Sequence, residues 1–176
     1  PADANETVQA WRCAILNTKG PTLIALSRQA LPTLDRALVA NADGVGKGAY
    51  VLADFGEGTP EIILMASGSE VNLIYEAGKQ LAAAGHAARV VSFASWELFE
   101  KMDKKYQESV LPSTIKRRLS VEAGIAQGWE KYTGTNGKNI SMLGFGASAP
   151  YMTLMEKFGF TVENVVNTAR TLISGD

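Results

Sequence analysis

The tetrapeptide Ser67-Gly68-Ser69-Glu70 combines residue types and a position that suit the binding of a small anion. It follows a short apolar run and opens a helical pattern, which places it at the carboxyl edge of a sheet, where open α/β folds bind ligands. The free backbone N–H groups of the first helical turn can hold an anion there. Serine is also a common N-cap residue, so Ser69 as a plain helix cap is the favoured alternative.

Arg28 is a second candidate, because it stands just after an apolar run, between Ser27 and Gln29. The guanidinium group has a fork geometry that suits phosphate or carboxylate. Taken by position alone, an isolated arginine is more often a solvated or salt-bridged surface residue. Residues 144–150, which are mostly small apart from Phe145 and end in Pro150, occupy a comparable turn after a strand, and we expect tight packing rather than a ligand there.

The sequence lacks the short motifs that most directly indicate a chemical mechanism: it has no P-loop, GxGxxG, HExxH or CxxC pattern. His86 is the only histidine, which excludes chemistry based on clustered histidines, and its place between Gly85 and Ala87 predicts an ordinary exposed turn residue. A single cysteine excludes an intrachain disulfide framework and a cysteine-rich zinc site. It indicates a reducing compartment, and we expect a cytoplasmic location.

Composition excludes two classes of partner. The 176 residues carry 18 acidic and 17 basic side chains, so no broad basic field favours nucleic acid. No apolar run approaches the roughly 20 residues that cross a bilayer, and no signal segment opens the chain, so no membrane partner is expected. Because the chain begins with Pro1 rather than Met, we expect a processed product or a piece of a longer protein.

The first part of the chain predicts one helix and one strand. Residues 1–19 form the helix, in which Asp3 caps the start, Glu6 is the reciprocal partner of a capping box, and apolar residues make one stripe (Val8, Trp11, Ile15 and Leu16). Residues 22–26 are nearly all apolar and predict a strand that is covered on both faces. Residues 31–48 lack a pattern and are rich in Gly and Asn, which indicates a linker and a domain boundary near Lys47.

After that boundary, strands and helices alternate. Strands are expected at 49–53, 61–66, 88–93, 118–122 and 140–143, and helices at 70–84, 96–102, 104–110, 151–158 and 162–173. This order predicts right-handed crossovers and an α/β fold, a three-layer α/β/α arrangement around a mainly parallel, mixed sheet of about five strands. Aromatic clusters around Trp96 and Trp129 have helical spacing and predict core packing or a subunit interface.

Several stretches, in order and across essentially the whole chain, resemble the last third of transketolase. They are PADANET (1–7), ALSRQ (25–29), ASGSEV (66–71), SWELF (95–99), ESVLP (108–112), SVEA (120–123), GWEKY (128–132), FGASAP (145–150) and FGFTVENV (158–165). The resemblance implies an enzyme of the pentose phosphate pathway that uses thiamine diphosphate and Mg to move a two-carbon ketol unit between sugar phosphates. It also implies a homodimer.

The resemblance assigns residues 1–46 to the end of the pyrimidine-binding domain plus a linker, and residues 47–176 to the C-terminal domain. The family's GDG-type metal motif is missing, since Asp43-Gly44 is not preceded by Gly, and the activating Glu would precede Pro1. The resemblance therefore implies no catalytic residue, cofactor or metal on this chain, which we predict to be inactive alone. Arg28 matches the family's arginine that binds the substrate phosphate.

Two other interpretations remain open. The chain could be a stand-alone module that binds a small anion or a nucleotide at Ser67, Gly68 and Ser69, or a pure assembly domain that buries Trp96 and Trp129 against a partner. Because residues 1–26 lack the sheet that the resemblance gives them, we also predict that they are disordered, swapped or docked abnormally.

Overall fold

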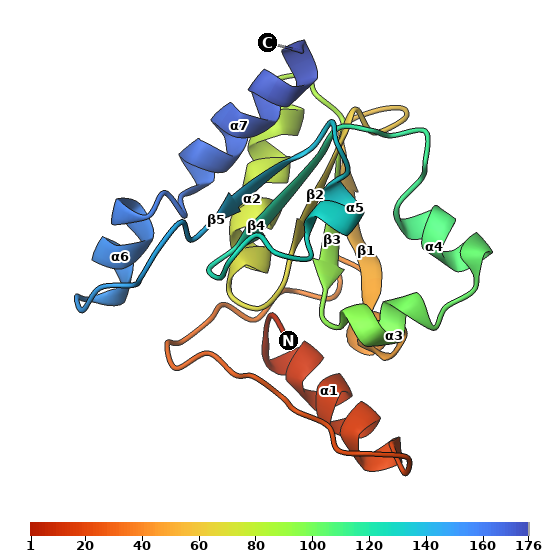
Figure 1. Ribbon diagram of the computed structural model, residues 1–176. Helices are drawn as coiled ribbons and strands as arrows, with labels where there is room; N and C mark the ends of the chain where they lie inside the picture. Colours follow the sequence, from red (N-terminus) through yellow and green to blue (C-terminus); the bar gives the residue numbers. More distant parts are fainter. Residues whose placement is uncertain (176) are drawn as a thin grey trace.

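A computed structural model describes residues 1–175, and its centre is a five-stranded sheet of order β1-β3-β2-β4-β5 (Figure 1). The strands are β1 (Ala49–Phe55), β2 (Ile62–Ala66), β3 (Ala88–Phe93), β4 (Arg118–Glu122) and β5 (Lys138–Ser141). Strands β2 to β5 are parallel, and β1 pairs antiparallel with β3. The predicted five-stranded, mainly parallel mixed sheet is confirmed, although β5 ends two residues earlier than expected.

Helices cover both faces of this sheet. The helices of the described residues are α1 (Ala4–Leu16), the 3-10 helix η1 (Ala42–Lys47), α2 (Glu70–Ala83), α3 (Trp96–Glu100), α4 (Lys104–Val110), α5 (Glu130–Thr133), α6 (Tyr151–Lys157) and α7 (Val162–Ser174). Helix α1 packs on η1 and lies beyond the edge of the sheet rather than on a face (Figure 1). One core cluster joins the sheet to α2 and α7, and the other joins it to α3, α4 and α5. The expected three-layer α/β/α arrangement is therefore present, and residue 176 lies outside the described residues.

Strand β2 shows why the local sequence forms this core. All five of its residues are buried; Ile62, Leu64 and Ala66 belong to the core cluster on one face, while Ile63 and Met65 belong to the other. A strand buried on both faces needs apolar residues at every position, which accounts for its unbroken apolar run. Helix α2 then ends beside Gly85, whose φ of +88° is the left-handed conformation that closes many helices.

The predicted capping box of α1 is half present. The carboxylate of Asp3 accepts a hydrogen bond from the Glu6 N–H at 2.8 Å, as expected for the cap. Glu6 does not reciprocate, because its Oε2 accepts from the N–H of Ala2 at 2.7 Å and its Oε1 faces β1 and β3. All three donors are buried, and they hold the Glu6 carboxylate inside the protein.

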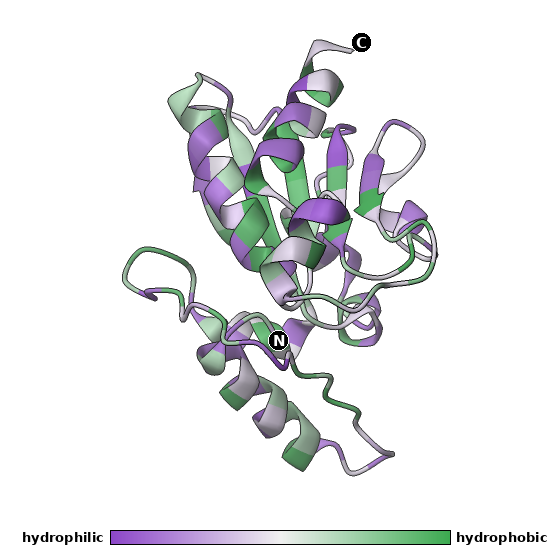
Figure 2. Ribbon diagram, turned by 90° about the vertical axis from the view of Figure 1, so that its left-hand side faces the viewer, coloured by the Kyte–Doolittle hydropathy of each residue, from purple (hydrophilic) through white to green (hydrophobic). Residues whose placement is uncertain are grey.

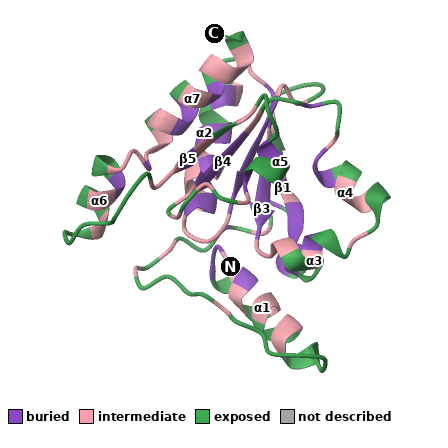
Figure 3. Cartoon of the chain, in the orientation of Figure 1, coloured by how far each residue is buried: buried purple, intermediate pink, exposed green. Residues whose placement is uncertain are grey.

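The strand predicted for residues 22–26 is absent. This segment runs in extended form beside α1 without a partner strand (Figure 1), and Leu23 is 94% exposed. The apolar stripe of α1 is likewise open, since its members are between 55% and 77% exposed (Val8, Trp11, Ile15 and Leu16). Figure 3 shows α1 buried only near its first turn, and Figure 2 shows the hydrophobic residues along it. A strand requires a neighbour to satisfy its N–H and C=O groups, and this segment has none.

The linker predicted for residues 31–48 is more ordered than its composition suggested. It ends in η1, in which Ala42, Gly44 and Val45 are buried. Gly44 lies against the ring of Tyr50, and a Cβ atom at this position would come within 2.3 Å of the ring. The glycine is therefore a close-packing residue rather than a sign of flexibility.

The turn at residues 144–150 also differs from the prediction. We expected tight packing, but the turn is exposed throughout, and a Cβ added at Gly144 or Gly146 would meet nothing within 4 Å. Phe145 and the preceding Leu143 are 100% and 99% exposed. No helix among residues 1–175 is both long and apolar enough to cross a membrane.

Candidate functional site

The carboxyl ends of β2 and β4 form the point where ligands most often bind in such sheets. The chain leaves β2 toward β3 on one side, whereas it leaves β4 toward β5 on the other. Adjacent strands whose connections diverge in this way leave a crevice outside their carboxyl ends. Ser67 directly follows β2 and Glu122 is the last residue of β4, so the predicted Ser67-Gly68-Ser69 turn lies at this crevice.

Two glutamates, rather than the serines, dominate the chemistry of this turn. The hydroxyl of Ser67 donates to Oε2 of Glu122 at 2.7 Å, and the hydroxyl of Ser69 donates to Oε1 of Glu70 at 2.7 Å. The N–H of Ala123 donates to Oε2 of Glu70 at 3.3 Å. Glu70 is only 3% exposed. Sequence analysis named Glu70 only as part of the turn and gave neither glutamate a role; the signals that could have found them are an acidic residue at a helix start after a buried strand, for Glu70, and one at the last position of a strand, for Glu122.

Burial raises the pKa of both carboxyl groups. For Glu70, loss of solvent outweighs the hydrogen bonds from Ser69 and Ala123, which lower its pKa. For Glu122, burial is again the largest cause, and the charge of Glu70 raises its pKa further, against the hydrogen bond from Ser67. A carboxyl pair of this kind favours proton uptake, because neighbouring like charges in a poorly solvated place are unfavourable.

Ser69 is the N-cap residue of α2, as predicted, but its side chain does not make the capping hydrogen bond. Its hydroxyl accepts no bond from an N–H of the first turn of α2. It is bound instead to the neighbouring Glu70 carboxylate, which lies in that first turn. A carboxylate at a helix start already interacts favourably with the positive end of the helix dipole. The anion site at residues 67–69 stays a prediction, and the two glutamates oppose it electrostatically.

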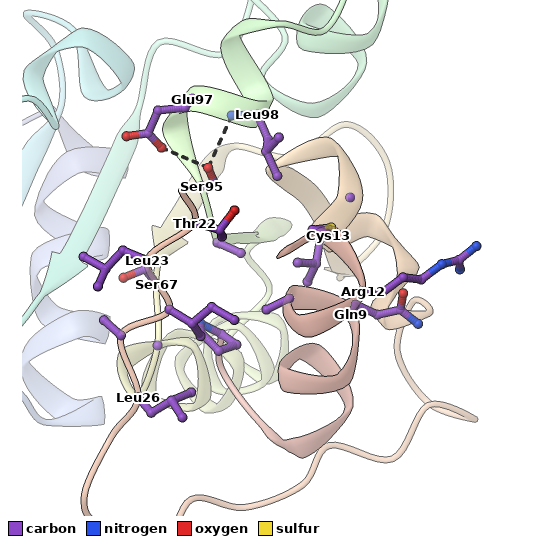
Figure 4. A pocket seen from close by; sticks show the side chains of 18 of the residues that line it. Gln9, Arg12, Cys13, Thr22, Leu23, Leu26, Ser67, Ser95, Glu97 and Leu98 are labelled. Atoms are coloured by element: carbon purple, nitrogen blue, oxygen red, sulfur yellow. Dashed lines mark hydrogen bonds between the residues drawn. The ribbon is translucent and has the colours of Figure 1, made fainter. Parts of the chain in front are cut away.

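An open groove of about 1280 Å³ runs between this crevice, α1 and residues 21–27. Figure 4 shows Gln9 and Cys13 of α1, Thr22 of the extended segment and Ser95, which directly precedes α3, around the groove. The hydroxyl of Ser95 caps α3 by accepting from the N–H of Leu98 at 3.3 Å. Residues 21–27 line the groove and make no backbone hydrogen bond to the sheet.

Arg28 lies at the end of the extended segment that borders the groove. It is exposed, and its neighbour Ser27 lines the groove while Arg28 does not. Within residues 1–175 its guanidinium takes part in no ion pair or hydrogen bond. The structure thus leaves the Arg28 guanidinium open to an external anion, next to the groove that residues 67–70 also line.

The remaining candidates, His86, Trp96 and Trp129, contact other side chains of this chain. His86 is a partly exposed turn residue whose Nδ1 lies 3.5 Å from Oε1 of Glu61. Trp129 is only 2% exposed and packs edge-on against Trp96, with ring centroids 5.3 Å apart, and against Phe93 at 5.6 Å. The aromatic cluster is therefore part of the core of this chain, the first of its two predicted roles.

Residues 48–161 match the protein family described as the transketolase-like TK C-terminal domain. The chain belongs to the transketolase family. The chloroplastic transketolase of Craterostigma plantagineum is 48% identical over 98% of this chain and 33% of its own length. The solved transketolase of Leishmania mexicana is 39% identical, with a TM-score of 0.90 over 99% of this chain and 25% of its own.

A further solved relative is the transketolase of Pichia stipitis in a complex with sedoheptulose 7-phosphate, 36% identical with a TM-score of 0.89. It is matched over 99% of this chain and 25% of its own length. The chain thus spans about a quarter to a third of the transketolases that it matches. The resemblance found in the sequence is confirmed, and it extends through the first 47 residues, beyond the matched domain.

Proposed function

We propose that this chain is the C-terminal part of a transketolase that transfers a two-carbon ketol unit between sugar phosphates. The observation that carries the proposal is the similarity to transketolases along nearly the whole chain, in sequence and in backbone. Residues 1–46 are then the end of the pyrimidine-binding domain with a linker, and residues 47–176 the C-terminal domain. The complex of the Pichia stipitis relative with a sugar phosphate supports the substrate class.

Thiamine diphosphate and Mg belong to this proposal through the family, but the residues of this chain do not fit them. Among residues 1–175, no three His, Cys, Asp or Glu side chains gather in an arrangement that could hold a metal ion. The GDG-type motif is also missing from the sequence. We therefore assign cofactor and metal to other parts of the full-length enzyme and derive no reaction step on this chain.

Arg28 is the residue through which the chain takes part in substrate binding. Its guanidinium is exposed and engaged by no other side chain in the described part of the protein. A free guanidinium can donate two parallel hydrogen bonds to a phosphate group. A single exposed arginine holds a sugar phosphate weakly, so the full-length enzyme must supply further groups held in place around the same substrate.

The homodimer is also part of the proposal. Exposed apolar side chains are grouped on α1 and on the turn after β5, including Trp11, Ile15 and Phe145. Contiguous apolar surface of this kind marks places where protein is normally covered by protein. In the full-length transketolase we assign these surfaces to contacts with the rest of the subunit and with its dimer partner.

Ketol transfer provides the test. The pure 176-residue chain, supplied with thiamine diphosphate, Mg, a ketose phosphate as donor and an aldose phosphate as acceptor, is expected to give no turnover, whereas the full-length enzyme containing it should be active. Turnover by the chain alone would refute the assignment of the cofactor to other parts. A full-length protein that binds thiamine diphosphate but transfers no ketol unit would refute the proposed activity.

The alternative of a small-anion or nucleotide module has its own test. Calorimetric titration of the chain with phosphate and with nucleotides is expected to give no binding heat at millimolar ligand, because Glu70 and Glu122 repel anions from the Ser67–Ser69 turn. Binding that is lost in Ser69→Ala would establish the alternative. The cytoplasmic location stays a prediction, and one relative carries the name chloroplastic.

A further inference from the structure

Glu6 is a fully buried carboxylate that lies outside the glutamate pair and the Arg28 surface. Its side chain is 0% exposed, yet three donors bind it: the Ala2 N–H at 2.7 Å, the Tyr50 hydroxyl at 2.8 Å and the Ser92 hydroxyl at 2.6 Å. A buried carboxylate is tolerated only when such donors replace its lost water. The site is therefore specific for a carboxylate.

The two hydroxyl donors come from one place in the sheet. Tyr50 and Ser92 are direct partners in the antiparallel ladder of β1 and β3, and both hydroxyls bind the same oxygen, Oε1 of Glu6. Side chains of directly opposite residues stand next to each other on the same face of a sheet. The sheet thus presents a preformed pair of donors, and Glu6 reaches it from α1.

A second set of hydrogen bonds stabilises the contact between Tyr50 and Glu6. Arg36 donates to the Tyr50 hydroxyl at 3.1 Å and binds both carboxylate oxygens of Asp3, at 2.8 and 2.9 Å. Asp3 also accepts from the N–H of Leu34 at 3.0 Å. Because Arg36 fills an acceptor position on the Tyr50 oxygen, the phenolic hydrogen is directed to Glu6. Burial and the neighbouring Glu6 raise the pKa of Tyr50 far above neutrality, so that hydrogen is retained.

The packing around Tyr50 leaves little freedom for a hinge. Gly44 of η1 lies directly against the Tyr50 ring, so the last turn before the sheet is part of the same contact. Ala2, Leu34 and Val39 belong to the same core cluster as the sheet residues Leu52 and Val90. Polar and apolar contacts thus converge on the first turn of α1.

We propose that Tyr50 and Ser92 form a carboxylate socket in which Glu6 locks residues 1–46 onto the sheet, so that the two parts unfold as one unit rather than moving as hinged domains. Hydrogen bonds to a charged, buried group are among the stronger ones in proteins, and an unmatched carboxylate in this position is strongly unfavourable. The lock does not depend on the proposed transketolase activity.

Hydrogen exchange measured by mass spectrometry on the full 176-residue chain tests the lock. Tyr50→Phe and Ser92→Ala each remove one hydroxyl donor and keep the apolar packing. In the double variant, amides of α1 should exchange about a hundred- to ten-thousandfold faster than in the wild type, because each of the two bonds to a buried charge contributes a factor of about ten to a hundred. Amides of β2 and β4 should keep their rates. Tyr75→Phe is the matched control, since the Tyr75 ring packs on Phe55 and its hydroxyl has no partner among the described residues.

Two results would overturn the proposal. One is an unchanged exchange rate of α1 in the double variant; the other is an equal acceleration of α1, β2 and β4, which would mean that the hydroxyls support only global stability. If this double variant fails to fold, Tyr50→Phe, Glu6→Gln and the combination of these two form a double-mutant cycle measured by urea unfolding. Strongly less-than-additive effects support the socket, and additive effects refute it.

Discussion

Glu70 and Glu122 are held by two serine hydroxyls that are only two residues apart in the chain. Ser69 binds Glu70 and Ser67 binds Glu122, each at 2.7 Å, so one short turn fixes both carboxyl groups at the ends of β2 and β4. The pair lies at the divergence point of the sheet, and burial raises the pKa of both groups.

The raised pKa values predict a specific pH dependence of stability. A carboxyl group whose pKa is higher in the folded protein than in the unfolded chain favours folding most at low pH, and this contribution disappears as the pH rises through the folded pKa. Glu122→Gln should therefore be more stable than the wild type at pH 7, and this advantage should shrink toward pH 4. Urea unfolding at both pH values measures the difference.

Glu156→Gln is the control for that measurement, because Glu156 is exposed on α6. Its stability relative to the wild type should depend little on pH. If Glu122→Gln were less stable than the wild type at pH 7, the carboxylate would be needed in its charged form, contrary to the surroundings described.

Gly44→Ala should destabilise the protein by about 1–3 kcal/mol, the usual effect of adding an atom to a well-packed core. The new Cβ would come within 2.3 Å of Cγ of Tyr50, which must then shift. Gly20→Ala is the matched control, since a Cβ there meets nothing within 4 Å. Thermal unfolding compares the two; equal melting temperatures would mean that η1 is not packed on Tyr50.

Arg28→Ala, made in the full-length transketolase, should raise KM for a phosphorylated substrate about ten- to a hundredfold, the effect of losing charge-assisted hydrogen bonds. Activity with an unphosphorylated substrate should change little. Arg12→Ala provides a control at another exposed arginine. Steady-state kinetics with the two substrate types measures both, and equal losses with both substrates would contradict a role in phosphate binding.

Residues 21–27 should exchange their amide hydrogens rapidly in the isolated chain. No backbone hydrogen bond joins them to another segment of residues 1–175, and Leu23 is almost fully exposed. Hydrogen exchange of a monomeric sample, with β2 as the protected reference, checks this. Firm protection of residues 23–26 would show that they pair with a strand in solution.

Sequence reasoning succeeded where structure depends on local pattern and failed where it depends on a partner. The apolar run of β2 and the helical period of α2 are visible in the sequence, because both elements bury residues at a fixed spacing. Residues 22–26 have a similar apolar run but no strand beside them, and pairing cannot be read from a single segment.

The misjudged polar residues have a related physical cause. Ser69 and Glu6 both occupy positions that capping rules describe, yet each bonds to a group that those rules do not consider. For Ser69 the competing partner is the next residue; for Glu6 it is Ser92, 86 positions away. The long-range partner of Glu6 is seen only in the folded chain. Arg28 was identified from its motif, and its role stays a prediction.

The antiparallel direction of β1 has a consequence for how the molecule is assembled. Ala49, the first residue of β1, lies opposite Phe93, the last residue of β3. The chain therefore enters β1 at the edge of the sheet where the parallel strands end. The residues that precede β1 therefore lie next to this edge without a segment that crosses the sheet. The antiparallel direction of the edge strand β1 thus determines that the preceding residues lie beside the crevice.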